Sequence, residues 1–492
     1  MTAAVIGGGF SGIAAAIALR KQGCQVTLFE KSSSVGGTWW DNTYPGAEVD
    51  TPSVLYSFSY APWRWSRTHV RQAELLDYLQ RVTERFGLSE SLRLGVTVER
   101  VEWIDTAQCW EITLTDGSIS RHQIVVSAVG FLSQPKYPDW PGLEEFGGRV
   151  VHTARWESDL PIEGRKIAVV GSGSTAAQVV PGLADMGAEL LMFQREPGWV
   201  LPKGARPYTD EERWALNSSI AQRISRYLML YRREKSQYRN AAWRPGTPQN
   251  EAAESAARKY IGTVFADRPD LAEAVTPSYP FGGKRPVLAD GLYPAMLKDN
   301  LTLVPHAVER VTRDGVVDKR GVEHKIESLV LATGFHTDFH TNFDVVGPHG
   351  TKLADAWGEE PEAMLGIMVP GFPNFFIMYG PNTNGGAIVT HLEAQASYIG
   401  AAARALGRRG ATRIEVKERP VKMFNAWLQR RLEGTSFEGA NNYYKSPSGR
   451  VITQWSDGAI IYTLMTRLLR RGTWRFGRTL ESAQPDENAG RQ

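Results

Sequence analysis

The feature that most constrains the fold is a glycine-rich turn between a strand-like apolar segment and an alanine-rich segment. It lies in "AAVIGGGFSGIAAAIALRKQGCQVTLFEK", where Gly7, Gly9 and Gly12 fit the spacing G-x-G-x-x-G. In a dinucleotide-binding βαβ unit these glycines permit a tight turn, close approach of the backbone to a pyrophosphate, and close helix–strand packing. Glu30 ends the next strand-like segment, where a carboxylate binds the ribose hydroxyls of a dinucleotide. The segment therefore predicts a first dinucleotide site.

The same pattern recurs in "KIAVVGSGSTAAQVVPGLADMGAELLMFQRE". Gly171 and Gly173 hold the first two positions, and Ala176 stands at the third, where alanine is an accepted variant. The second strand-like segment ends at Arg195, followed by Glu196. A carboxylate repels the 2′-phosphate of NADP, whereas a guanidinium attracts it. We therefore predict NADP at the second site and FAD or NAD at the first, with Glu196 reducing the positive charge.

Two such units in one chain of 492 residues predict an α/β fold with two Rossmann-like dinucleotide-binding domains. The strand-like segments "QIVVSAVGF" and "SLVLATGF" close at Gly130 and Gly334, and they mark where the chain crosses between the domains. A helical pattern rich in charged and aromatic residues occupies about 208–270. We expect a helical insertion there, which either shapes substrate access or serves as a structural cap.

Composition and charge narrow the function classes. The 56 basic and 53 acidic residues give a net charge of +3, which offers no electrostatic case for nucleic acid. No uninterrupted apolar run approaches about 18 residues, the length that a membrane-spanning helix needs. Cys24 and Cys109 form no CxxC pair, so we expect a reducing, cytoplasmic location and no metal site.

The segment "RLLRRGTWRFGRTL" near the C-terminus is basic and aromatic. One interpretation is weak contact with a membrane surface. The interpretation we favour is a packed C-terminal helix followed by a solvated tail. We expect a monomer or a homodimer.

Two longer motifs carry a resemblance to a known family. The segment "FGGRVVHTARW" fits F-x-G-x-x-x-H-x-x-x-W through Phe146, Gly148, His152 and Trp156. Residues 36–50, "GGTWWDNTYPGAEVD", fit [AG]-G-x-W-x-x-x-x-[FY]-P-[GM]-x-x-x-D. The sequence thus resembles the class B flavoprotein monooxygenases, and specifically the type I Baeyer–Villiger monooxygenases. The related flavin-containing monooxygenases usually end the first motif in Tyr or Phe, so its tryptophan favours the Baeyer–Villiger branch.

The resemblance implies FAD and NADP(H) as cofactors and a small-molecule ketone and O₂ as substrates. The implied reaction inserts one oxygen atom next to the ketone carbonyl through a C4a-peroxyflavin and gives an ester or lactone. Oxidation of sulfur or nitrogen is a side activity or an alternative, and a non-catalytic flavin or nucleotide sensor is another. A pyridine-nucleotide–disulfide reductase needs a close cysteine pair, which this sequence lacks.

The resemblance also implies a domain order in which the NADP domain is inserted in the FAD domain. The bounds we expect are 1–145 for the first part of the FAD domain, 146–328 for the NADP domain with its helical insertion at about 208–270, and 329–492 for the second part of the FAD domain with a C-terminal cofactor-closing loop.

The residues that the resemblance implies for catalysis are Arg285, in "FGGKRPVLADGLY", and Asp50. The guanidinium reaches the flavin, and the carboxylate orients it through a charge-assisted hydrogen bond. Lys284 joins the second-site arginine on the 2′-phosphate, and His152 has a structural or conformational role between the domains. The segment "EGANNYYKSPSGR" resembles the family's loop that closes over the nicotinamide cofactor, with Tyr443 where many relatives have tryptophan.

The loop in "MYGPNTNGGAIVTHLEAQ" leads into a helix whose N-terminal amides are suited to negative charge on a reduced flavin. The residues expected to bind one of the two cofactors are Gly7, Gly9, Ser11, Gly12, Glu30, Gly37, Thr38, Trp39, Asp50, Tyr56, Val98, Gly171, Gly173, Ser174, Thr175, Arg195, Lys284, Arg285 and Tyr443.

Overall fold

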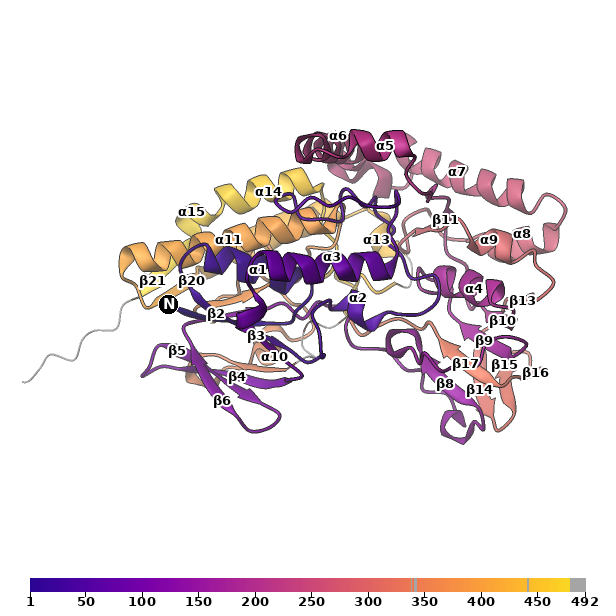
Figure 1. Cartoon of the computed structure of the whole chain (residues 1–492), viewed down its shortest axis with the longest axis horizontal. Helices are drawn as coiled ribbons and strands as arrows, with labels where there is room; N and C mark the ends of the chain where they lie inside the picture. The colour runs from indigo at the N-terminus through magenta and orange to yellow at the C-terminus, as the bar shows by residue number, and fades with distance from the viewer. Residues whose placement is uncertain (338, 340–342, 440–441, 478–492) are drawn as a thin grey trace, which may run out of the picture.

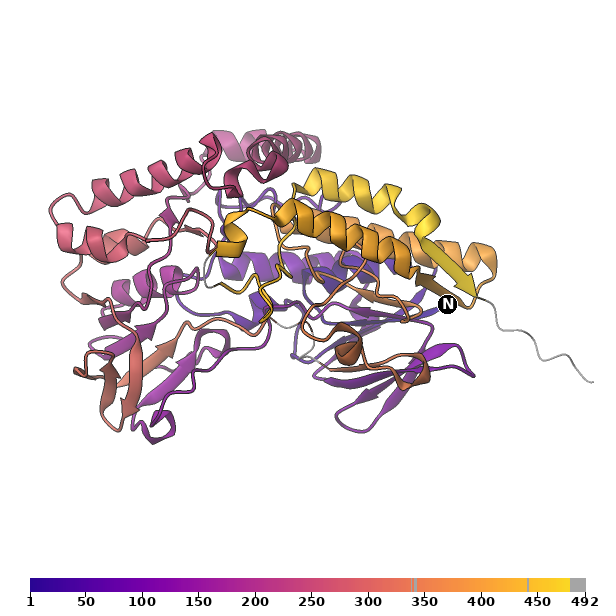
Figure 2. The same cartoon turned by 180° about the vertical axis from the view of Figure 1, so that it is seen from behind.

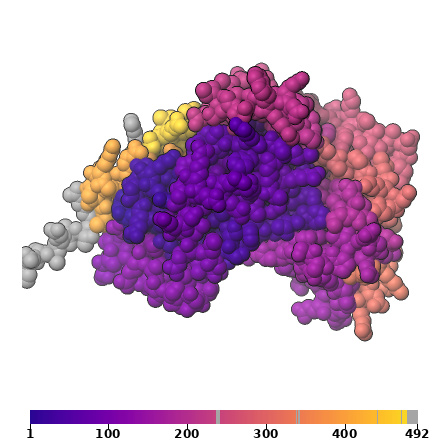
Figure 3. Space-filling model, viewed as in Figure 1, coloured from indigo at the N-terminus to yellow at the C-terminus, as the bar shows by residue number. Residues whose placement is uncertain are grey.

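The computed structural model describes residues 1–337, 339, 343–439 and 442–477. These residues form two lobes, each built on a five-stranded sheet (Figure 1). Every strand pair in the two sheets is parallel, as the predicted Rossmann-like domains require. The space-filling view shows the lobes parted by a notch along their lower edge (Figure 3).

The first sheet has the strand order β19-β7-β1-β2-β3. Alternate residues of β1 are buried on opposite faces. Ala3 and Val5 pack against the helices α1 and α11, whereas Ala4 and Ile6 pack against a β-meander that includes Trp110. Burial on both faces explains the continuous apolar run of this strand. The elements are β1 (Thr2–Ile6), β2 (Gln25–Glu30), β3 (Leu92–Leu94), β7 (Ile124–Ser127), β19 (Phe375–Ile377), α1 (Phe10–Arg20) and α11 (Ile388–Arg409), with the meander β4 (Val98–Ile104), β5 (Cys109–Leu114) and β6 (Ile119–His122), to which β18 (Asp344–Val346) adds in parallel beside β4.

The second sheet has the order β13-β10-β9-β17-β8 and repeats this arrangement. Ile167 and Val169 of β9 face α4 and α9, and Ala168 between them faces a three-stranded antiparallel sheet. The elements are β8 (Arg149–His152), β9 (Lys166–Val170), β10 (Glu189–Phe193), β13 (Leu301–Val304), β17 (Ser328–Leu331), α4 (Ala176–Asp185) and α9 (Leu292–Ala295), with β14 (Val308–Thr312), β15 (Gly315–Asp318) and β16 (Glu323–Lys325).

The second lobe is inserted in the first. The chain leaves the first sheet after β7, builds the whole second sheet from β8 to β17, and returns to the first lobe with β18 and β19. The two strand-like segments at the predicted crossings are β7 and β17. The fold class expected from the sequence is therefore confirmed.

The next four α-helices after α4 precede β12; the first three lie along the top of the molecule, and the fourth lies below the third (Figures 1 and 2). The first begins at a capping box formed by Thr209 and Glu212, and the third begins at Thr247 with Pro248 in its first turn. The second reaches the first lobe, because its Leu230 packs in a cluster with Leu55, Ala387 and Ala459. The helices are α5 (Asp210–Ala215), α6 (Ser219–Gln237), α7 (Pro248–Val264) and α8 (Pro269–Val275).

The C-terminal part packs on the first lobe. Helix α11 ends at Gly410, whose φ of +55° suits a left-handed C-cap. The end of the described chain pairs as β21 (Trp474–Gly477) with β20 (Arg413–Val416), so part of the predicted basic tail is a strand; residues 478–492 lie outside the described part. Within the described residues no helix is long and apolar enough to span a bilayer. The remaining elements are β11 (Val200–Leu201), β12 (Val287–Leu288), α2 (Thr38–Asp41), α3 (Gln72–Arg85), α10 (Leu353–Trp357), α12 (Glu418–Leu432), α13 (Ser436–Gly439), α14 (Ala459–Leu468) and α15 (Arg470–Thr473).

Candidate active site

The first glycine turn connects β1 to α1. Gly7 has φ +108°, and a Cβ on it would lie 2.6 Å from the carbonyl oxygen of Ala128. A Cβ on Gly12 would lie 1.8 Å from the carbonyl oxygen of Gly7, so neither position admits a side chain. Helix α1 begins without a side-chain cap, which leaves its first N–H groups directed at the space beyond the turn. This geometry suits a pyrophosphate.

Glu30 is buried at the end of β2. Its carboxylate accepts hydrogen bonds from the backbone N–H groups of Gly8 at 2.6 Å and Ser32 at 2.8 Å. A carboxylate has about four lone-pair positions, so each oxygen retains acceptor capacity for a ribose hydroxyl. Val98, also expected near this site, begins β4, and its side chain packs in the apolar core beneath the sheet.

The aromatic loop lies directly on the glycine turn. Gly37, at φ +55°, approaches Gly9 so closely that a Cβ on it would lie 3.0 Å from the Gly9 Cα. Thr38 begins the short helix α2, and the ring of Trp39 meets that of Tyr56 edge-on at 5.6 Å. The loop therefore forms a wall of rings beside the N-terminal end of α1.

Asp50 and Arg285 form the ion pair that the resemblance implied. Arg285 Nη2 donates a hydrogen bond to Asp50 Oδ2 across 235 positions of sequence. The Asp50 charge raises the pKa of Arg285 further, so the guanidinium stays protonated. Burial alone would raise the pKa of Asp50, but the charges of Arg285, Arg233 and Lys203 outweigh it and hold that pKa below its usual value. Both side chains still reach solvent, with exposed fractions of 42% for Arg285 and 21% for Asp50.

Residues from the C-terminal segment lie against this pair. Tyr443 and Tyr444 are near enough to influence the pKa of Arg285, and their rings meet at 4.8 Å. Asn442 Nδ2 donates to the carbonyl oxygen of Gly283 at 2.7 Å, immediately before the Lys284–Arg285 pair. The predicted closing loop is thus in contact with the cationic loop, although its residues 440–441 lie outside the described part.

The second glycine turn connects β9 to α4. Gly171 has φ +141°, and a Cβ on it would lie 2.4 Å from the carbonyl oxygen of Ala332, whereas a Cβ on Gly173 would meet nothing within 4 Å. Ser174 and Thr175 lead into α4, which has neither a side-chain cap nor an acidic residue in its first turn. The open space and the uncapped amides suit an approaching phosphate.

The expected phosphate-binding cations lie at the end of β10. Arg195 is exposed, and the neighbouring Glu196 forms an ion pair with Lys284. The ion pair brings Lys284 to the residue that follows Arg195 in the sequence. It also neutralises part of the lysine charge, which the sequence did not show.

His152 lies at the junction of the lobes and is buried. Its Nδ1 accepts the Ala154 N–H at 3.1 Å, so Nε2 carries the proton and donates it to the carbonyl oxygen of Gly334 at 3.1 Å. Burial lowers the pKa of His152, which favours this neutral form. These contacts tie the end of β8 to the segment after β17.

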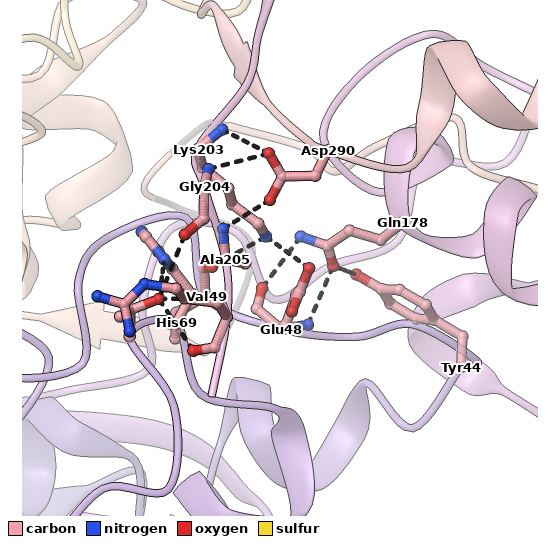
Figure 4. A network of polar contacts seen from close by, with 11 residues as sticks. Tyr44, Glu48, Val49, His69, Gln178, Lys203, Gly204, Ala205 and Asp290 are labelled. Atoms are coloured by element: carbon pink, nitrogen blue, oxygen red, sulfur yellow. Dashed lines mark hydrogen bonds and ion pairs between the residues drawn. The ribbon is translucent and has the colours of Figure 1, made fainter. Parts of the chain in front are cut away.

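Sequence reasoning did not identify a polar network around Glu48 and Val49, the two residues that precede Asp50 in the sequence (Figure 4). Lys203 forms a buried ion pair with Glu48, and Asp290 and Gln178 hold the surrounding backbone. In "WVLPKGARPY" the lysine lies between proline and glycine, a setting typical of a solvated loop. Burial was the missing signal, and it depends on residues far away in sequence. Among the described residues no group of His, Cys, Asp and Glu side chains is arranged to hold a metal ion.

The model of the pyridine nucleotide-disulphide oxidoreductase family matches residues 4–231. Both cysteines are free and buried, and burial raises the pKa of each thiol, so the chain has no reactive cysteine pair of the disulfide-reductase kind.

Similarity over nearly the whole chain is to monooxygenases. A Baeyer–Villiger monooxygenase of Streptomyces coelicolor is 37% identical over 463 residues, covering 92% of this chain and 88% of that protein. A closed crystal structure of cyclohexanone monooxygenase superposes with a TM-score of 0.87 at 28% identity, covering 97% of this chain and 99% of the other. A crystal structure of the OTEMO complex with FAD and NADP gives a TM-score of 0.87 at 25% identity with the same coverage. Together with the two glycine turns and the Asp50–Arg285 pair, this places the chain in the Baeyer–Villiger monooxygenase family.

Proposed function

We propose that this protein is an NADPH- and O₂-dependent Baeyer–Villiger monooxygenase, which inserts one oxygen atom next to a ketone carbonyl and releases an ester or lactone. The observation that carries the proposal is the ion pair of Arg285 with Asp50, which joins the two dinucleotide-binding lobes. A guanidinium is charged at every working pH. A fixed positive charge beside the reacting atoms stabilises negative charge as it develops on oxygen.

FAD fits the first lobe. Gly7, Gly9, Ser11 and Gly12 would hold its pyrophosphate, and Glu30 its ribose. Two observations support this fit: the backbones of Gly9 and Gly37 lie close together with no side chain between them, and α1 begins without a side-chain cap. Thr38, Trp39 and Tyr56 complete the residues that we assign to this cofactor, together with the backbone of Val98, whose side chain lies in the core. When bound, FAD supplies the activation of O₂ and accepts hydride from NADPH.

NADP fits the second lobe. Gly171, Gly173, Ser174 and Thr175 would receive the pyrophosphate at the start of α4, where the backbone lies open. Arg195 and Lys284 would bind the 2′-phosphate. Tyr443, beside Arg285, would contact the nicotinamide half when the C-terminal loop closes.

In the reaction, the residues of the chain supply a fixed positive charge and orient the side chain that carries it. Asp50 is ionised and accepts from the guanidinium, which fixes the direction in which Arg285 presents its remaining N–H groups. Those groups would receive the negative charge that develops on the ketone oxygen. The first N–H groups of α11, which begins without a side-chain cap, would offset negative charge on the reduced cofactor.

We assign the FAD domain to 1–145 and 329–492 and the NADP domain to 146–328, with the helical insertion at about 208–270. A cytoplasmic location is supported by the two unpaired, buried thiols. The protein is proposed to act as a monomer or homodimer, and contact of the basic C-terminal segment with a membrane surface stays a separate proposal.

The test of this function is Arg285→Ala, with the exposed Arg310→Ala as the matched control. Purified proteins are incubated with NADPH and a panel of linear, cyclic, aryl and steroidal ketones, and both NADPH oxidation and oxygenated product are measured. Arg285→Ala should retain bound FAD, seen by its visible absorbance, and lose about 10²–10³-fold in ester formation. Arg310→Ala should behave as the wild type. Near-normal oxygenation by Arg285→Ala would refute the assigned role.

A further inference from the structure

We propose that Lys203 is a positioning residue for the catalytic pair. Through its buried ion pair with Glu48, it fixes the peptide before Asp50 and thereby sets where the Asp50 carboxylate meets Arg285. The inference deepens the proposed function and rests on it for the chemistry, but its geometry stands on the contacts alone.

The ammonium of Lys203 is enclosed between the lobes (Figure 4). Its side chain is 1% exposed, and Nζ lies 2.6 Å from Glu48 Oε1. The same nitrogen donates to the carbonyl oxygen of Val49 at 3.3 Å. That carbonyl belongs to the peptide bond whose nitrogen is Asp50's own. Lys203 therefore binds Val49 through the backbone carbonyl of Val49 and binds Glu48 through the side-chain carboxylate of Glu48.

Lys203 is itself held by the element that carries Arg285. Strands β11 and β12 pair in parallel, with Val200 opposite Val287. Lys203 follows β11 by two residues, and Arg285 precedes β12 by two. Lys203 and Arg285 therefore extend from opposite ends of this two-stranded sheet toward the segment that contains Asp50.

Asp290, two residues after β12, fixes the backbone around Lys203. Asp290 Oδ1 accepts from the N–H groups of Lys203 and Gly204, each at 2.9 Å, and Oδ2 accepts from that of Ala205 at 2.7 Å. Three backbone amides bound by one carboxylate leave the start of the Lys203 side chain little freedom. The ammonium is therefore presented to Glu48 from a rigid base.

The opposite side of the same segment is held by α4. Gln178 Nε2 donates to the carbonyl oxygen of Glu48 at 3.0 Å, and Gln178 Oε1 accepts from the Tyr44 hydroxyl at 3.0 Å and the Glu48 N–H at 3.3 Å. Gly46 packs against the α4 backbone, since a Cβ there would lie 2.3 Å from the Gln178 carbonyl oxygen. Asp50 therefore follows a segment held on both sides by the second lobe.

A purely structural ion pair and a positioning one differ in what happens when both charges are removed. Replacing only Lys203 leaves the Glu48 carboxylate, which is 20% exposed, without its charge partner, and this destabilises the fold. Replacing both by apolar side chains of similar length removes that penalty. If the pair only stabilises the fold, the double variant should be fully active. If the pair positions Asp50, the double variant should still lack the correct placement of the Asp50 carboxylate.

The experiment compares Lys203→Met, the double variant Lys203→Met/Glu48→Met, and Lys298→Met as the matched control, because Lys298 forms an exposed pair with Asp185 at 42% and 69% exposure. For each, the thermal midpoint, bound FAD, the KM for NADPH, the kcat for ester formation and the ester formed per NADPH consumed are measured. We expect Lys203→Met to lose stability and the double variant to regain it. Both should keep FAD and the KM, yet lose on the order of 10²-fold in kcat for ester formation, the effect of a displacement of about 1 Å. Lys298→Met should match the wild type.

A crystal structure of the double variant gives a readout independent of turnover. We expect the Asp50 carboxylate to lie beyond hydrogen-bonding reach of Arg285 in it, and within reach in Lys298→Met. A double variant that recovers both stability and ester yield, or that keeps the Asp50–Arg285 bond unchanged, would overturn the inference. If the wild type forms no ester from any ketone but the variant displaces Asp50, the proposed function fails and the positioning role stands.

Discussion

At the scale of single residues, the preference for NADPH depends on very few charges. Arg195 is exposed at the end of β10, and Lys284 shares its charge with Glu196. Arg195 is therefore the cation with more of its charge to offer a 2′-phosphate. Charge-assisted hydrogen bonds contribute roughly 1.5–3 kcal/mol.

We expect Arg195→Gln to lower the ratio of kcat/KM for NADPH over that for NADH by about 10- to 100-fold, because each 1.4 kcal/mol is a factor of ten. Steady-state kinetics with both nucleotides measure this ratio. Glu196→Gln is the companion variant and should shift the ratio the other way, since it releases the charge of Lys284. An unchanged ratio in Arg195→Gln would place the phosphate elsewhere.

At the scale of elements, α6 belongs to the inserted lobe by sequence but is fastened to the first lobe. Arg226, on α6, is buried and pairs with Glu393 of α11 at 3.8 Å. Its guanidinium donates to four acceptors of the first lobe: the carbonyl oxygens of Val54 at 3.0 Å, Leu55 at 3.2 Å and Ser57 at 2.6 Å, and Thr390 Oγ1 at 3.1 Å. Glu234, two turns later, caps the start of α14 by accepting from the Ala459 N–H at 2.7 Å.

Arg226→Met should therefore cost about 3–5 kcal/mol of unfolding free energy, because it removes the charge partner of the Glu393 carboxylate, which is only 17% exposed, and the shared guanidinium donor of three carbonyls. Urea unfolding measures the loss, and limited proteolysis should show earlier cleavage within α6. Arg223→Met, on the exposed side of the same helix, is the control and should be nearly neutral. Equal stability of the two variants would mean that α6 is not anchored in this way.

At the scale of the whole molecule, buried histidines make the fold sensitive to acid. His391 lies within α11 with its ring 4.7 Å from that of Tyr462, and burial lowers the pKa of His391 to about 4. In the unfolded chain the pKa is about 6.5, so below that pH the unfolded state binds more protons than the folded state. Stability from this residue is complete above pH 6.5 and is lost as the pH falls through about 4.

The shift corresponds to a loss on the order of 3 kcal/mol between these limits. We expect His391→Leu to lose less stability than the wild type when urea midpoints at pH 7 and pH 4.5 are compared. The half-exposed His306→Leu controls for removal of a histidine as such. Parallel losses in the wild type and His391→Leu would assign the acid sensitivity to other groups.

Much of the fold was readable from local sequence. The two glycine turns, the strands on either side of them and the crossings at β7 and β17 each follow from a few neighbouring residues, and the structure has all of them. The resemblance supplied the partnership of Asp50 with Arg285, and the ion pair is present. Its catalytic role, and the assignment of individual residues to FAD or NADP, stay predictions.

The sequence by itself determined the two nucleotide-binding folds, because the glycine spacing and the strand-like and helix-like segments on either side of it are local features of the chain. Only the tertiary structure decided what surrounds the reactive pair. The burial of Lys203, its contact with the Asp50 peptide and the anchoring of α6 join residues more than a hundred positions apart. The pKa and the interactions of a charged side chain change when residues distant in sequence exclude water from it. A local sequence pattern does not indicate which residues those are.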